Sequence, residues 1–305
     1  MKVITNADDF GIDFDRDFGI FLAALFGLVS SVSVIVTNKI SCFQKIMISI
    51  MKRKISVGLH VNLTDNPLTM FNTDDLYIHK YNFVKPKYIF WKNCLENSIL
   101  LENIELEIAS QFNIFVNKFG FIPNHIDGHN HCNIFNKQIN DIFTDYAKKY
   151  NIHLRIPYEN ITKYDKTIIS DNTLFNDFVF FKCKKNFSLN DVLKNYELFF
   201  KYDFVLYNCL CDIYCLKDNI KFIGSIYGYF RKSKVLYQQI IKFNKDECVQ
   251  IMVHPGFYFP FMKHKTLFSN FDRVKEFLVL WRFNIYISKD KKINIVNYNY
   301  KKIEN

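Results

Sequence analysis

The stretch His125-Ile126-Asp127-Gly128-His129-Asn130-His131 places three histidines and one carboxylate within seven residues. In an extended segment alternate side chains share one face, so the histidines and the carboxylate are expected to project in the same direction. Imidazole and carboxylate groups are the usual protein ligands of zinc, iron and related divalent ions. The stretch therefore predicts a strand that ends in a metal site. The alternative interpretation is a solvated, histidine-rich turn.

Other apolar runs end in residues of the same kind. Asn6-Ala-Asp8-Asp9-Phe-Gly11 closes the first run, and Gly58-Leu-His60-Val-Asn62-Leu-Thr64 closes the third. Arg155 and His254 follow later apolar runs in the same way. The carboxyl ends of parallel strands meet at one side of an α/β fold, where ligands bind. We therefore expect these polar side chains to gather in one crevice.

Short apolar strands alternate with helical stretches along the chain. This order predicts an α/β fold with a parallel sheet that is either open or closed into a barrel. The expected strands are Val3–Thr5, Val32–Val36, Ile55–Leu63, His125–Asp127, Leu154–Pro157, Phe222–Gly224 and Val249–His254. The expected helices are Phe14–Phe26, Ile40–Met51, Leu101–Phe119, Phe135–Tyr150, Ser233–Lys242 and Phe271–Trp281.

The length of 305 residues allows one large domain with an insertion. We assign residues 1–290 to the α/β domain. A Lys- and Asn-rich excursion at about 160–219 interrupts it, and 291–305 are expected to form a basic C-terminal tail. The excursion contains none of the polar motifs, which is typical of a substrate lid or of tolerated surface.

The composition excludes several classes of protein. Hydrophobic residues make up 49% of the chain and aromatic residues 17%, which excludes disorder for most of its length. The net charge of +10 comes from lysines spread along the chain rather than from a basic groove with interleaved aromatics, so we expect no nucleic-acid partner. The densest basic run, Lys289 to Lys292, is interpreted as a solvated hairpin.

The expected location is the cytoplasm. Eight cysteines in a chain of this length are interpreted as mostly buried, reduced thiols. The uncharged run Phe18 to Asn38 is divided by Gly27 and by Ser30-Ser31-Val-Ser33, so it predicts a helix packed on a buried strand rather than a membrane span. The sequence is compatible with a homodimer.

The motifs NADDFG, GLHVNLT, HIDGHNH, RIP and MVHPGF, in this order, resemble those of the YdjC-like carbohydrate deacetylases, which include the chitooligosaccharide deacetylases. The resemblance extends from Asn6 to about Leu280, outside the excursion. It implies an irregular (β/α) barrel related to the polysaccharide deacetylases. It also implies a hydrolase that releases acetate from N-acetylated sugars with one divalent metal ion, Mg²⁺ or Zn²⁺. On this resemblance the ion is held by Asp9, His60 and His129.

Three further residues are candidates for catalysis. Asp8 is placed as the general base for the attacking water, and His254 as the acid that protonates the departing amine. Arg155 is expected to pair with Asp8 and keep it ionised. The alternatives are a helix N-cap for Asp8, a packed turn histidine for His254, and an exposed pair with Glu159 for Arg155.

Four residues are assigned to substrate contact or to support of the ligands. Asp127, His125 and His131 are expected around the metal site rather than as its ligands. Phe257 is expected either to stack on a sugar ring or to pack in the core. The sequence departs from the related HxHxH pattern at Asn133, which leaves any supporting role of that position open.

Two other functions remain open on the sequence. The His129/His131 pair is also typical of amidohydrolase-like or phosphoesterase-like hydrolases, which need further ligands and a second metal. A catalytically inactive carbohydrate-binding protein is the other alternative.

An Arg273–Glu276 pair resembles a family helix motif that supports the site from outside.

Overall fold

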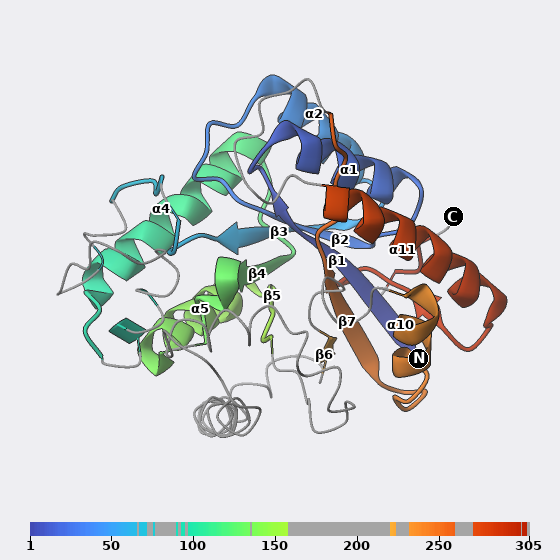
Figure 1. Cartoon of the computed structure of the whole chain (residues 1–305). Coiled ribbons are helices and arrows are strands. Elements are labelled where there is room, and N and C mark those ends of the chain that lie inside the picture. The colour runs from blue at the N-terminus through green and yellow to red at the C-terminus, as the bar shows by residue number, and fades with distance from the viewer. Residues whose placement is uncertain are drawn as a thin grey trace, which may run out of the picture.

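The protein is seen here in a computed structural model in which parallel strands lie at the centre and helices lie around them (Figure 1). The structure describes residues 1–65, 67–71, 97–134, 136–157, 220–223, 232–259, 271–299 and 301–303, together with Leu76, Phe90, Asn93 and Cys94. The excursion expected at about 160–219 lies outside the described residues. Its place in the domain organisation stays a prediction.

The sheet confirms the expected α/β class and the barrel-type strand order. Its strands run in the order β5-β4-β3-β2-β1-β7-β6, and every neighbouring pair among them is parallel. This is the order of a (β/α) barrel that is open between β5 and β6 in the described part of the chain. The strands are β1 Lys2–Phe10, β2 Ser31–Val34, β3 Ser56–Val61, β4 His125–Gly128, β5 His153–Leu154, β6 Ile220–Ile223 and β7 Cys248–Val253.

The helices contact one another in chain order around the outside of the sheet. α11 contacts α10 and α1, α1 contacts α2, α2 contacts α4, and α4 contacts α5. The helices are α1 Phe14–Leu25, α2 Cys42–Met51, α4 Leu101–Phe119, α5 Lys137–Tyr150, α10 Ser233–Ile240 and α11 Phe271–Lys289. None of the helices in the described part of the chain combines the length and the apolar character that a bilayer crossing requires.

Local capping explains where several helices begin and end. The Asp13 side chain accepts from the Arg16 N–H at the start of α1, and Ser41 forms a capping box with Gln44 at the start of α2. α4 ends at Gly120 with φ 73°, the left-handed conformation that glycine adopts without a steric penalty. α11 continues beyond the expected end at Trp281, because Phe283 and Ile287 extend its buried face.

The segment expected to be a basic tail differs from that expectation. Asn294–Ile295 forms a further strand, β8, that pairs in parallel with Lys2 and Val3 of β1. Tyr298 is buried, and its hydroxyl donates to the Gln250 side chain at 2.7 Å. Apolar side chains of this segment face the core while its lysines stay exposed. The number of lysines predicted a tail, whereas the chain returns to the sheet.

His125 lies in a closely fitted space below the carboxyl ends of β3 and β4. Its ring stacks on Tyr298 with centroids 4.2 Å apart. On another side it meets Gly58 of β3, where an added Cβ would lie 2.2 Å from His125 Cε1. No side chain fits at position 58 unless the ring moves.

We expect Gly58→Ala to lower the free energy of unfolding by about 1–3 kcal/mol, because the methyl group overpacks the His125 ring. Urea unfolding measures the change. In a His125→Ala background the same substitution should cost much less, because the methyl group then enters vacated space. Equal costs in both backgrounds would contradict the clash as the cause.

Candidate metal centre

The carboxyl end of β1 places two adjacent carboxylates in the crevice. The pairing of β1 with β2 becomes irregular between Ala7 and Phe10, and Asp9 has φ 70°. A non-glycine residue in this left-handed conformation is uncommon and often marks a functional position. The irregular strand end accompanies different environments for the two carboxylates, since Asp8 pairs with Arg155 and Asp9 with the histidines.

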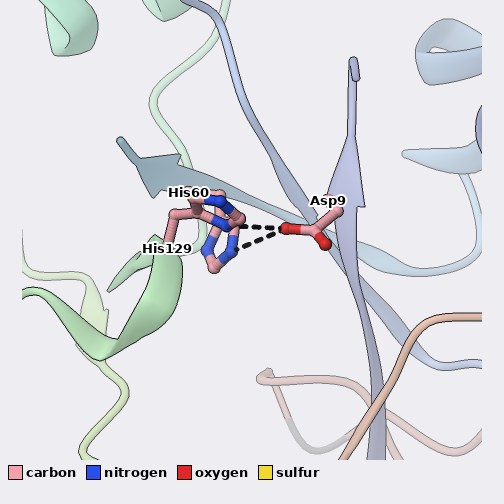
Figure 2. A group of neighbouring side chains, drawn as sticks. All are labelled: Asp9, His60 and His129. Carbon is pink, nitrogen blue, oxygen red and sulfur yellow. Dashed lines mark ion pairs between the residues drawn. The ribbon is translucent and has the colours of Figure 1, made fainter. Parts of the chain in front are cut away.

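Asp9, His60 and His129 point toward one another from three separate elements (Figure 2). Asp9 Oδ1 lies 2.8 Å from His129 Nδ1 and 3.3 Å from His60 Nε2. One ligand atom from each residue lies within 4.8 Å of the other two. Asp9 Oδ1 is buried and accepts no well-directed hydrogen bond. A buried carboxylate oxygen beside two imidazole nitrogens fits a divalent ion.

Asp127 orients His60 within this cluster. The His60 Nδ1 and Asp127 Oδ1 atoms are 2.6 Å apart, which leaves His60 Nε2 directed at Asp9. Burial alone would lower the pKa of His60, but the carboxylates of Asp127 and Asp8 raise it above its usual value. A carboxylate behind a histidine ligand is the arrangement that fixes ring orientation in metal sites. Asp127 thus supports the centre without being one of the three converging residues.

Asp65 has the corresponding position behind His129, and the sequence analysis missed it. Its Oδ2 lies 2.8 Å from His129 Nε2. The Asn62 side chain holds the Asp65 backbone, accepting from its N–H at 3.0 Å and donating to its carbonyl at 2.7 Å. Burial would lower the pKa of His129, but Asp9 and Asp65 raise it to about 10. The one available signal was the place of Asp65 directly after the GLHVNLT motif.

Arg16 is a second residue that the sequence analysis missed. It lies on α1, and its Nη1 donates to Asp9 Oδ2 at 2.5 Å. The two oxygens of Asp9 therefore have different partners, Arg16 on Oδ2 and the pair His60 and His129 on Oδ1. Burial would raise the pKa of Asp9, but His129 and Arg16 hold it well below the usual range.

Arg155 pairs with Asp8, as expected. Its Nη1 and Nη2 donate to the two Asp8 oxygens at 2.6 and 2.7 Å, and both side chains are buried. Burial would raise the pKa of Asp8, but Arg155 and His60 lower it. The N-cap interpretation of Asp8 is wrong, because Asp13 caps α1. Glu159, the alternative partner of Arg155, lies outside the described residues.

His254 lies near Oδ2 of Asp9, the oxygen that does not contact His129. Its Nε2 is 3.8 Å from Asp9 Oδ2, and its Nδ1 is 3.9 Å from Glu276 Oε1. Glu276 also accepts from the His254 backbone N–H at 2.7 Å and from Arg273 at 2.7 Å, so the expected Arg273–Glu276 pair is present. Burial lowers the pKa of His254 and favours the neutral imidazole.

His125, His131 and Phe257 have three different environments. His125 Nε2 contacts the Ser33 hydroxyl at 2.9 Å, and burial lowers its pKa to about 3. His131 has φ 56° and a buried Nδ1 without a hydrogen-bond partner, and burial lowers its pKa to about 3. The Phe257 ring contacts three other aromatic rings, those of Phe18, Phe259 and Phe277.

The curled parallel sheet, with an Asp–His–His cluster at the carboxyl ends of its strands, defines a class of α/β proteins that present metal ligands from a barrel-like sheet. The model of the YdjC-like protein family matches residues 2–282. The chain belongs to this family.

Curated relatives match about half of the chain. Two proteins named chitooligosaccharide deacetylase, from Klebsiella pneumoniae and Escherichia fergusonii, are each 34% identical over 157 residues. The match covers 50% of this chain and 58% of each relative. A crystal structure from Enterococcus faecalis, described as a candidate cellobiose-phosphate cleavage protein, has a TM-score of 0.66 at 20% identity and covers 98% of this chain and 97% of its own. That likeness supports the fold alone.

We expect His60→Ala and His129→Ala each to abolish tight binding of a divalent ion, because two remaining ligands hold it poorly. Elemental analysis after dialysis measures the ion content. His153→Ala is the matched control, since His153 lies beside Tyr298 rather than in the cluster. Full ion content in either test variant would remove that residue from the ligand set.

The affinity for the ion should rise with pH. The pKa of about 10 means that His129 carries a proton at pH 7 in the ion-free protein, and this proton must leave when an ion binds. The apparent affinity should therefore rise roughly tenfold per pH unit between pH 7 and 9. Chelator competition at several pH values measures it, and a flat profile would contradict proton displacement at His129.

Proposed function

We propose that this chain is a metal-dependent hydrolase that removes acetyl groups from N-acetylated sugars of the chitooligosaccharide type and releases acetate. The observation that supports it most is the convergence of His60 and His129 on one buried carboxylate oxygen of Asp9. The names of the two curated relatives support the substrate class. A cytoplasmic location and a homodimer stay predictions.

Asp9, His60 and His129 would hold one ion, which we propose to be Zn²⁺ or Mg²⁺. Imidazole nitrogen suits zinc better than magnesium, so we expect Zn²⁺ to bind more tightly. When bound, such an ion polarises an amide carbonyl and lowers the pKa of a coordinated water. With three protein ligands the centre keeps open positions for water and substrate.

Asp8 is the proposed general base. Its Oδ2 lies 3.7 Å from His60 Nε2, so it faces the same space as the ligand atoms. Arg155 keeps the Asp8 carboxylate ionised and fixes its orientation, so an oxygen is available to accept the proton of an attacking water. The low pKa of Asp8 means that the proton is readily passed on.

His254 is the proposed acid for the leaving group. An amide nitrogen leaves as a neutral amine only after it gains a proton. His254 Nε2 faces the centre from the side of Asp9 Oδ2, and Glu276 holds the backbone of His254 in place. A neutral imidazole in this position can take the proton released at Asp8 and deliver it to the nitrogen.

His131 is the proposed substrate contact. The buried Nδ1 has no hydrogen-bond partner, which is a cost that a sugar hydroxyl or the acetamido group would remove. Among the described residues the converging cluster includes His129 but not His131. The alternative hydrolases that use a His129/His131 pair therefore receive no support from this geometry. Phe257 packs among aromatic rings, and we assign it no sugar contact.

Acetate release from N-acetylglucosamine oligomers tests the function. We expect the full chain to release acetate, to lose this activity with a chelator, and to regain it with Zn²⁺ or Mg²⁺. An ion-loaded protein that binds the oligomers without releasing acetate would instead support the inactive carbohydrate-binding alternative.

Asp8→Asn should retain the ion and lose about 10²–10⁴-fold in turnover, because the amide keeps the shape but accepts no proton. Acetate release and elemental analysis on the same sample measure both effects. If Asp8→Asn loses the ion while Asp9→Asn retains it, the two aspartates have exchanged roles.

His254→Ala should lose about 10²–10⁴-fold on amide substrates and much less on an activated ester, because a phenolate leaves without protonation. The ion content should stay unchanged. A structural role for His254 would instead reduce thermal stability and lower both activities equally. Equal losses on amide and ester would remove the general-acid role.

A further inference from the structure

Arg16 binds the oxygen of Asp9 that does not face His60 and His129. Its side chain is 2% exposed, and its Nη1 donates to Asp9 Oδ2 at 2.5 Å. Asp9 Oδ1, the oxygen beside His60 and His129, is left without a hydrogen bond. The carboxylate is thus shared between a fixed guanidinium and the site of the ion.

The charge of Arg16 acts on two carboxylates, on Asp9 through an ion pair and on Asp17 at longer range. Arg155 binds both oxygens of Asp8 and lies 3.1 Å from Asp127, whereas the ion pair found for Arg16 in the described residues is with one oxygen of Asp9. Arg16 Nε is buried without a hydrogen bond. The neighbouring Asp17 instead accepts from the Gly11 N–H and from Gln44, each at 2.6 Å.

We propose that Arg16 is the resident counter-cation of the metal centre, which stabilises the ion-free cluster and weakens ion binding. This inference rests on the metal site proposed above. Without an ion, Arg16 and the protonated His129 together neutralise a carboxylate that would otherwise be costly to bury. With an ion, a guanidinium and a divalent cation share one carboxylate and repel each other.

Two effects of Arg16 on affinity oppose each other, and their sizes decide the sign. Its hydrogen bond orients Asp9, and loss of such a supporting contact typically weakens metal binding by about 10–100-fold. Repulsion between a unit charge and a divalent ion that share one carboxylate would weaken binding by more than about a thousandfold at the dielectric of partly buried sites. The repulsion is the larger effect, so removal of the charge should tighten binding.

Two substitutions separate charge from orientation. Arg16→Gln keeps a hydrogen-bond donor and removes the charge, while Arg16→Lys keeps the charge and removes the planar fork. Arg282→Gln is the matched control, because it makes the same change in net charge at an exposed position of α11. The dissociation constant for Zn²⁺ is measured on the full chain by competition with a chelating dye.

We expect Arg16→Gln to bind Zn²⁺ at least about tenfold more tightly than the unaltered chain. Arg16→Lys should stay within about threefold of it, and Arg282→Gln should not change. The melting temperature of ion-free Arg16→Gln should fall, and Zn²⁺ should raise it by more than it raises that of the unaltered chain. Unchanged or weaker binding by Arg16→Gln would overturn the inference.

Two other results remain decisive. If ion-free Arg16→Gln does not fold, Arg16→Lys becomes the test: affinity within about threefold supports the inference, and a tenfold loss overturns it in favour of orientation alone. If the unaltered chain binds no more Zn²⁺ than His129→Ala does, the proposal of a metal site is itself wrong. That outcome differs from a failure of the Arg16 inference, in which the unaltered chain binds the ion and Arg16→Gln binds it no better.

Discussion

The buried pair between Arg155 and Asp8 is the interaction on which the rest of the centre depends. Arg155 follows β5 and Asp8 lies near the end of β1, and Arg155 also lies 3.1 Å from Asp127 of β4. One guanidinium therefore connects three strand ends that are far apart in the sequence. Removal of one member of such a buried pair typically costs about 3–5 kcal/mol, because the remaining charge is left unpaired.

The same network sets the ionisation of the groups around it. Arg155 and His60 together lower the pKa of Asp127 against the effect of burial, and Asp127 in turn raises the pKa of His60. Asp127 also accepts from the Ser33 hydroxyl at 2.7 Å, so β2 joins the arrangement. The ligand orientations are thus fixed by hydrogen bonds between neighbouring strands before any ion binds.

Sequence patterns were sufficient for the elements and for most of the cluster. The parallel sheet and the gathering of polar side chains follow from polar residues at successive strand ends, because parallel strands bring those ends together. The barrel and the set Asp9, His60 and His129 came from the resemblance to the YdjC-like deacetylases. Arg16 and Asp65 were not predicted, since neither stands at a strand end. Arg16 reaches the centre from a helix, and Asp65 from the loop after β3. Side-chain reach across elements leaves no periodic signal in one sequence.

The C-terminal segment shows a different limit of sequence-based prediction, and its late synthesis has a consequence for folding. Lysine content concealed the register of β8 and the burial of Tyr298, which packs beneath His125. The N-terminus of a growing chain leaves the ribosome first, so β1 to β4 emerge long before Tyr298 does. Tyr298 can therefore pack against His125 only when almost the whole of the described chain has left the ribosome. Until then β4, which leads to His129, lacks the ring contact that covers His125 in the folded protein.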